Sequence, residues 1–369
     1  MTPGTPRSKQ PLYFVNAAVD FALIGGLSIA TFAAFWFVGG PHGAPMPREA
    51  VLTIAAALMW VVNWPHFSAT SYRLYHARAN IAQYPITALV IPLLLTVVLI
   101  GSFASPEGVA PWLVKMFTIW SPYHFSAQTL GITLIYARRG GFAVTPRVRL
   151  ALAGFIFGTF LVQTAVTEAG QGLGTFYTVA YPILGLPDWV PDLLRLWMWA
   201  CGTMFLYFVV SASRQRGRIL PPIILLPAVT QFVWFYMGWR LPAFNEFVPF
   251  FHAMQYLLIA WVMQIGETLA ARAPAGRRRF VVFETLRWAA FNLVGGIVLF
   301  WALPRIGQQA GFTLPFATAV IISAVQIHHF FVDGVIWKLR NPRVASPLMS
   351  SIDDLIAGPA PLAAAVKAA

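Results

Sequence analysis

Five histidines stand in long apolar stretches of the sequence, where an ionisable side chain is costly. His66, His124 and His252 lie on three separate stretches, and His328 and His329 share a fourth. Neutral imidazole binds iron, zinc or copper and brings no net charge into an apolar interior. Three or four imidazoles with one open position would hold a ferrous ion that can bind dioxygen. These five residues are the candidate metal ligands, and only one of His328 and His329 can point directly inward, because helix neighbours are about 100° apart.

Polar residues lie about one helical turn beyond several of these histidines. Thr70, Gln128 and Gln255 each follow a histidine by three or four positions, and Asp333 follows His329 by four. At this spacing a side chain can reach the imidazole, and a hydrogen bond to the ring would fix its tautomer. We therefore predict that Thr70, Gln128 and Gln255 support the ligands and that Asp333 is a catalytic residue.

Asp333 and His76 each have a second interpretation. Asp333 could form an ion pair with Lys338 or Arg340 at the inner membrane surface instead of serving the site. His76 lies between two arginines close to a predicted inner loop. We predict an interfacial position for His76, with a place in the metal site as the alternative.

The elements that carry these residues are predicted to be membrane-spanning helices. Hydrophobic residues make up 58% of the 369 residues and charged residues only 10%, whereas soluble domains hold about 25% charged residues. The apolar stretches run for about 20 residues without a period of two, which favours an all-α bundle over a barrel. About ten transmembrane helices are predicted, at residues 14–40, 48–79, 83–104, 110–138, 146–168, 190–213, 219–240, 244–271, 280–303 and 313–340.

The basic residues indicate how these helices are oriented. The net charge is +13, but the charges lie between apolar segments, so we predict a membrane protein with no nucleic-acid partner. If the N-terminus is cytoplasmic, all but six of the 25 Lys and Arg residues fall at the cytoplasmic side. This asymmetry predicts ten spans with both termini cytoplasmic, in a bacterial-type inner membrane. The six exceptions are Arg48, Lys115, Arg195, Arg240, Arg287 and Arg305.

The chain is predicted to hold a single transmembrane domain, residues 1–341, and a cytoplasmic tail. The tail, residues 342–369, is rich in Ala and Pro and has few large apolar residues, so we predict that it is disordered or lies on the surface. Residues 169–190 form a long outer loop rich in glycine and aromatic residues, either a lid over a cavity or an ordinary packed loop. Cys201 is the single cysteine, which rules out a disulfide framework and a cysteine metal site.

Around its histidines the sequence resembles the bacterial β-carotene dioxygenase family, Brp/Blh. Members of that family are helical membrane proteins whose histidines hold a non-haem iron and which cleave carotene to retinal. The sequence PH at 65–66 resembles the family's early Pro-His motif, and YHFS at 123–126 resembles its Ile-His-Phe-Gly motif. FFH at 250–252 resembles its Phe-x-His segment, and His328 with Asp333 resembles its closing His-x4-Asp.

The resemblance covers these four patches and the general topology, and it implies an iron ligand in each patch. The chain also departs from the family pattern. Tyr256 occupies the position of a second histidine in the third segment, and the Gly-Ala-Leu-Asp that follows the family's first histidine is absent. His329 is the candidate to replace the lost ligand. We take Tyr256 and Asp333 as candidate catalytic residues.

Three functions are compatible with this histidine pattern. The first is a membrane-embedded non-haem iron oxygenase, which would use Fe(II) and dioxygen on a lipophilic, isoprenoid- or lipid-like substrate among membrane lipids. The second is a haem b protein, in which two histidines ligate the haem for oxidation or electron transfer. The third is a transporter whose histidines line a proton or metal path. The chain has no glycine-rich phosphate loop and no nucleophile elbow.

Overall fold

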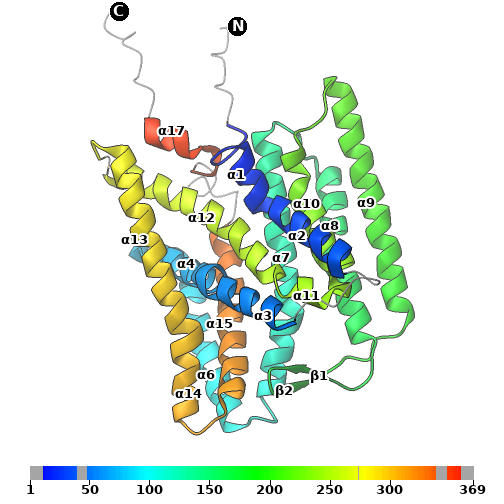
Figure 1. The fold of residues 1–369 in the computed structure, drawn as a ribbon, viewed down its shortest axis with the longest axis vertical. Coiled ribbons are helices and arrows are strands. Elements are labelled where there is room, and N and C mark those ends of the chain that lie inside the picture. The colour runs from blue at the N-terminus through cyan, green and yellow to red at the C-terminus, as the bar shows by residue number, and fades with distance from the viewer. Residues whose placement is uncertain (1–10, 40–47, 273, 338–346, 359–369) are drawn as a thin grey trace, which may run out of the picture.

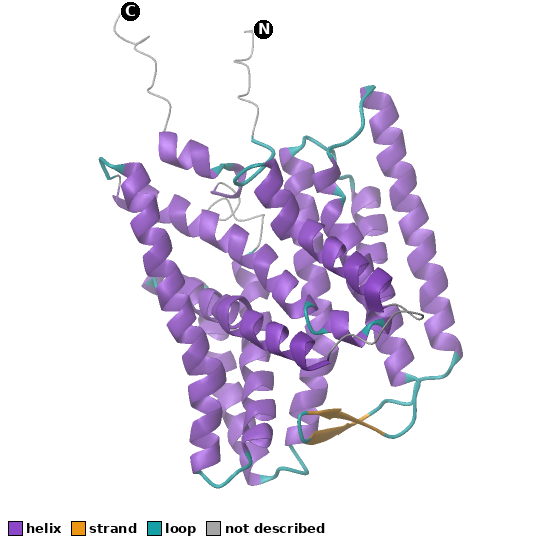
Figure 2. Cartoon of the chain, in the orientation of Figure 1, coloured by secondary structure: helices purple, strands orange, loops and turns teal. Residues whose placement is uncertain are grey.

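The computed structural model describes residues 11–39, 48–272, 274–337 and 347–358. Figure 1 shows long helices that form a bundle, with a short β-hairpin at one end. In Figure 2 nearly all of the regular structure in these ranges is helical. The all-α bundle predicted from the sequence is therefore confirmed.

Most helices of the bundle follow the predicted spans to within a few residues, and several are interrupted by a π-turn or a 3-10 turn. The first half of the described chain contains α1 (Ala17–Phe21), η1 (Ala22–Gly26), α2 (Leu27–Gly39), α3 (Arg48–Leu58), η2 (Met59–Asn63), α4 (Trp64–Tyr75), α5 (Arg78–Gln83), η3 (Ile86–Val90), α6 (Ile91–Ala104), α7 (Ala110–Arg139) and α8 (Pro146–Glu168). The second half contains β1 (Leu173–Phe176), β2 (Val179–Pro182), α9 (Trp189–Arg216), η4 (Pro222–Ile224), α10 (Leu226–Phe232), η5 (Val233–Met237), η6 (Gly238–Arg240), α11 (Pro242–Asn245), α12 (Val248–Arg272), α13 (Arg277–Ile297), η7 (Val298–Ala302), α14 (Leu303–Gln309), α15 (Leu314–Ile336), η8 (Pro347–Met349) and α17 (Ile352–Ala357).

Eight helices in the described ranges are long and apolar enough to cross a membrane, so the chain is an integral membrane protein. Two of the ten predicted spans are not among these eight. α7 has 30 residues but carries Lys115, His124 and Gln128 within its length. α10, η5 and η6 hold only 7, 5 and 3 residues, whereas a span needs about 20.

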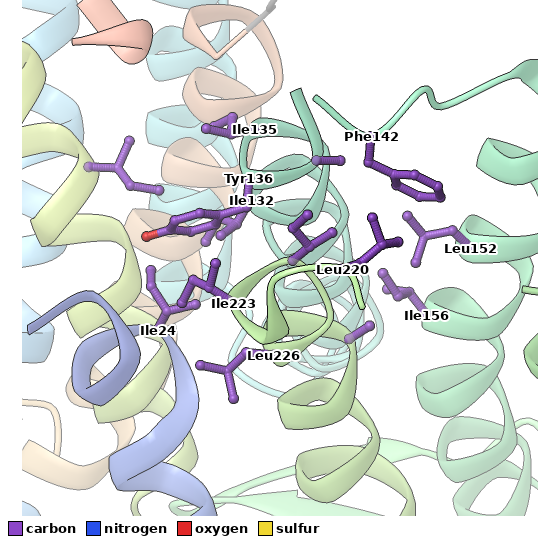
Figure 3. Packing of buried hydrophobic residues seen from close by; sticks show 14 of the residues in the cluster. Ile24, Ile132, Ile135, Tyr136, Phe142, Leu152, Ile156, Leu220, Ile223 and Leu226 are labelled. Carbon is purple, nitrogen blue, oxygen red and sulfur yellow. The ribbon is translucent and has the colours of Figure 1, made fainter. Parts of the chain in front are cut away.

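A large hydrophobic cluster lies between α7, α8, η4 and α10 and reaches the first helical segment (Figure 3). Ile24, Tyr136, Leu152 and Ile223 are fully buried there. In a membrane bundle such contacts stabilise the fold by close packing, because lipid is as apolar as the helix interface. The cluster fixes α7, which carries one of the histidines, against three neighbouring elements.

Part of the predicted disordered tail is folded. In residues 347–358, Leu348 is 0% and Ile352 is 7% exposed. Arg139 Nη1 donates to the carbonyl of Leu348 at 2.6 Å, and the amide of Ile352 donates to the carbonyl of Phe14 at 2.8 Å. Two apolar side chains and these hydrogen bonds anchor this segment to the bundle, so of the two predicted alternatives it is ordered at the surface of the bundle and not disordered. Residues 342–346 and 359–369 lie outside the described residues.

The long loop at residues 169–190 contains the antiparallel hairpin of β1 and β2, in which Leu173 pairs with Pro182. A buried ion pair fixes the loop to the bundle: Lys115 Nζ lies 2.5 Å from each carboxylate oxygen of Glu168, the last residue of α8. The amide of Leu184 also donates to this carboxylate, at 2.9 Å. The loop is thus packed near the start of α7 and the end of α8.

Candidate metal centre

Four histidines from four helices meet in the interior of the bundle. They are His66 of α4, His124 of α7, His252 of α12 and His329 of α15, and one ring nitrogen of each lies within 4.8 Å of the others. All four side chains are buried, the most exposed being His124 at 5%. Each of the four apolar stretches that carry the candidate ligands therefore contributes one histidine to the group.

His66 is oriented by a break in its helix. The π-turn η2 runs directly into α4, and Pro65, which has no N–H to donate, stands just after this local widening of the helix. α13 packs closely against this turn at Gly296, because a Cβ there would lie 2.7 Å from the carbonyl carbon of Trp64. The backbone that carries His66 is therefore held from both sides.

His124 and His252 are positioned by prolines and by aromatic packing. Pro122 lies inside α7, two residues before His124, and Pro249 lies in the first turn of α12, three residues before His252. The ring of His252 stacks on Phe125, with centroids 3.8 Å apart and planes 6° apart. This stacking fixes the plane of the His252 ring beside His124.

The four imidazoles contact one another edge to face. The rings of His124 and His329 have centroids 4.6 Å apart, and those of His66 and His252 are 5.2 Å apart. Phe67 contacts both His66 and His329, at 4.7 and 4.8 Å between centroids. Phe67 thus covers one side of the cluster with an apolar ring.

The ring nitrogens of the cluster are poorly satisfied by the protein. Among the described residues, both nitrogens of His66, both of His252 and Nδ1 of His329 are buried without a hydrogen-bond partner. A buried polar group without a partner costs about 1–3 kcal/mol, and native structures contain few of them. Several on adjacent imidazoles indicate that something else binds these nitrogens.

The spacing of the nitrogens fits a metal ion. Nε2 of His124 and Nε2 of His329 lie 3.0 Å apart. With metal–nitrogen bonds of about 2.1 Å, two ligands at a right angle are separated by about 3.0 Å. Four neutral imidazoles are a donor set suited to Fe, Zn, Cu or Ni. The residues present therefore fit a first-row transition metal.

Asp333 and Tyr256 lie beside the four imidazoles. Asp333 Oδ2 is 3.5 Å from Nε2 of His329 and 3.7 Å from Nε2 of His124. Thr70 Oγ1 lies 2.6 Å from the hydroxyl of Tyr256 and 3.2 Å from Asp333 Oδ1. A carboxylate, a phenol and a hydroxyl thus form one buried group next to the nitrogens. The alternative partners of Asp333, Lys338 and Arg340, lie outside the described residues.

Thr70, Gln128 and Gln255, which were predicted to support the ligands, form hydrogen bonds with groups other than the imidazole rings. Thr70 contacts Tyr256 and Asp333, as above. Gln128 Nε2 donates to the main-chain carbonyl of His252 at 3.0 Å, and Gln255 Nε2 donates to the carbonyl of Ile24 at 2.5 Å. Both glutamines therefore fix helix positions, and the predicted bonds to ring nitrogens are not formed. The reason is geometric: spacing along one helix does not say which neighbouring helix a side chain reaches.

His328 and His76 lie outside the four-histidine group. Nε2 of His328 is 3.2 Å from the hydroxyl of Tyr75, and the two rings are nearly parallel. His76 caps the end of α4, where its Nδ1 is 3.0 Å from the carbonyl of Tyr72. His329, not His328, is the histidine of α15 that points into the cluster.

A cavity of about 330 Å³ adjoins the cluster between α7, α12, α15 and η8. His124, Tyr256 and Asp333 form part of its wall, so the cavity reaches the candidate ligands. Most of the other lining residues are apolar or aromatic, among them Ile259 and Phe330. The site therefore combines a metal-binding donor set with a space suited to an apolar molecule.

Two parts of the site were not predicted. Trp337 Nε1 donates to Asp333 Oδ1 at 3.1 Å, and Gln231 Nε2 donates to Ser126 Oγ of α7 at 2.8 Å. Both residues carry a polar group among apolar neighbours, and this was the only sign in the sequence that they serve the site.

Comparison with protein-family models, curated proteins and solved structures finds no match to this chain. The resemblance to the β-carotene dioxygenase family stays a prediction.

Proposed function

We propose that this protein is a membrane-embedded non-haem iron oxygenase that oxidises a lipophilic, isoprenoid- or lipid-like substrate with dioxygen. The observation that carries the proposal is the convergence of four buried imidazoles whose nitrogens largely lack protein partners. The adjoining apolar cavity supports a lipophilic substrate. The sequence resemblance supports iron as the metal.

A bare ion is favoured over haem b by the crowding of the ligands. The two axial ligands of a haem lie on opposite faces of a wide porphyrin. Here four imidazole nitrogens lie within 4.8 Å of one another, and aromatic rings pack around them. A transporter is less favoured, because the cavity beside the cluster is mostly apolar, whereas an ion path needs polar groups along its length.

His66, His124, His252 and His329 would hold the iron, which would bind and activate dioxygen. The four electrons that reduce dioxygen come from the substrate, so no external reductant is needed: one C=C bond breaks, and each carbon gains one oxygen atom as a carbonyl. Within this chain, the apolar walls bind the substrate beside His124. Asp333 and Tyr256, which also line the cavity, are placed to contact the reacting part of the substrate.

We further propose that ten segments cross the membrane, including α7 and the segment η4 to η6, and that both termini are cytoplasmic. The arginine-rich ends of α7, α9 and α12 support this orientation. The membrane would be a bacterial-type inner membrane, where dioxygen and lipophilic substrates are both soluble.

Metal analysis of the purified full-length protein tests the proposal. We expect stoichiometric iron in the wild type and a large loss of iron in His66→Ala, His124→Ala, His252→Ala and His329→Ala. His328→Ala is the matched control, because it removes the neighbouring imidazole outside the cluster, and it should retain the metal.

The same samples distinguish the competing functions. Iron without a Soret absorption band supports the proposal, whereas a Soret band would assign the histidines to haem. A wild type without bound metal, or four variants that keep it, would overturn the metal centre. Consumption of dioxygen with a lipophilic alkene then tests the reaction class.

A further inference from the structure

We infer that two glycines, Gly131 of α7 and Gly334 of α15, determine which substrates the cavity accepts by keeping it open for a slender apolar chain. This inference rests on the proposed function, because it concerns the substrate of the same site. Both glycines line the cavity that reaches His124 and Asp333.

The cavity is elongated along α7. Trp120, His124, Gly131 and Ile135 all line it and recur on one face of the helix. The rise from Trp120 to Ile135 is about 22 Å, so the lining extends over about four turns of α7. A lining of this length suits an extended chain.

Gly131 and Gly334 differ from the glycines that serve packing. A Cβ at Gly158 would lie 2.7 Å from Met198, and one at Gly296 would lie 2.7 Å from the carbonyl carbon of Trp64. At Gly131 and Gly334 an added Cβ meets no atom of the described residues within 4 Å. Packing among the described residues therefore does not require glycine at these two positions.

Glycine inside a helix also costs about 1 kcal/mol relative to alanine. Gly131 and Gly334 each lie inside a long helix, α7 and α15. Neither close packing nor helix propensity explains them, and the feature they share is the cavity wall. A side chain at either position would project from the cavity wall, and Gly334 directly follows Asp333.

A photoreactive probe tests this inference on the full-length protein. The probe is a straight-chain C18 alcohol with a diazirine on the chain, and crosslinked peptides are mapped by mass spectrometry. In the wild type we expect saturable labelling of α7 and α15, and at least tenfold less in Gly131→Leu and in Gly334→Leu. The corresponding alanine variants should show an intermediate loss.

Gly276→Leu is the control, because a Cβ there also meets no atom within 4 Å but the residue precedes α13, outside the cavity. Its labelling should equal that of the wild type. The inference would be overturned if the leucine variants were labelled as strongly as the wild type. It would also be overturned if a sterol diazirine labelled the cavity of the wild type as strongly as the straight-chain probe does. Metal content is measured on the same samples. A wild type without metal would refute the proposed function alone. Full metal content together with equal labelling of the wild type and the leucine variants would refute the inference alone.

Discussion

An imidazole buried in an apolar bundle gives up its hydrogen bonds to water at both ring nitrogens. His66 and His252 have no replacement for either bond within the described residues. At about 1–3 kcal/mol for each such group, a bundle with no use for these nitrogens would be more stable with apolar residues in their place. At the scale of single residues, a bound cation explains the cost better than packing does.

Asp333 should strengthen metal binding without being one of the four converging ligands. Its carboxylate lies 3.5 Å from Nε2 of His329, so its negative charge would stabilise a cation held by neutral imidazoles. We expect Asp333→Asn to lower metal affinity by about 10- to 100-fold, measured by competition with a chelator. Asp353→Asn removes an exposed carboxylate of α17 and should leave affinity unchanged. An unchanged affinity in Asp333→Asn would mean that the carboxylate does not act on the metal.

The sequence predicted the histidines of the site better than it predicted their neighbours. Apolar surroundings identified His66, His124 and His252, because this feature depends on one helix at a time. The choice between His328 and His329 depends on the rotation of α15 about its axis, which packing decides. Bonds such as that from Gln255 to Ile24 cross 231 positions of sequence and have no local signal.

At the scale of elements, π-turns and prolines change the direction of the helices next to the histidines. These local changes help to aim the side chains at one point. π-turns precede α4 and α6, and prolines lie near His66, His124 and His252. Each break re-aims the next turn, and neighbouring helices must then satisfy the freed backbone groups. The helix ranges were predictable from hydropathy, but the π-turns were not, because one extra residue per turn leaves hydropathy unchanged.

The ion pair between Lys115 and Glu168 should be the main anchor of the hairpin loop. Both side chains are nearly buried, at 4% and 6% exposed. Removing one partner leaves the other charge buried, so Lys115→Met and Glu168→Gln should each destabilise the protein by about 3–5 kcal/mol. Thermal unfolding in detergent and limited proteolysis of the loop measure the effect.

The double variant Lys115→Met/Glu168→Gln provides the internal control for this anchor. Because it leaves neither charge buried, it should be more stable than the sum of the single effects predicts. Additive losses would show that the two groups do not interact energetically, and the loop would then depend on its apolar contacts, such as Phe176 on Phe117.

The whole molecule has two chemically different ends. α9 and α12 end in arginine, and α13 begins with three arginines, at the end of the bundle where Figure 1 shows α1 and α17. The hairpin of β1 and β2 lies at the opposite end. The charge pattern predicted this division, whereas it gave no sign that residues 347–358 fold back, since that depends on contacts with Phe14 and Arg139.

This asymmetry predicts that the arginine-rich end faces the cytoplasm. Cys201 is the single cysteine, so Cys201→Ala gives a background for single-cysteine labelling. Glu107→Cys reports the loop between α6 and α7, and Arg218→Cys reports the loop after α9. Both native residues are exposed.

In intact spheroplasts a membrane-impermeant maleimide should label Glu107→Cys and should reach Arg218→Cys only after lysis. The reverse pattern would invert the proposed topology, and labelling of both before lysis would show that the two loops share one side of the membrane. Because neither loop touches the histidine cluster, the result for orientation is independent of whether the protein binds a metal.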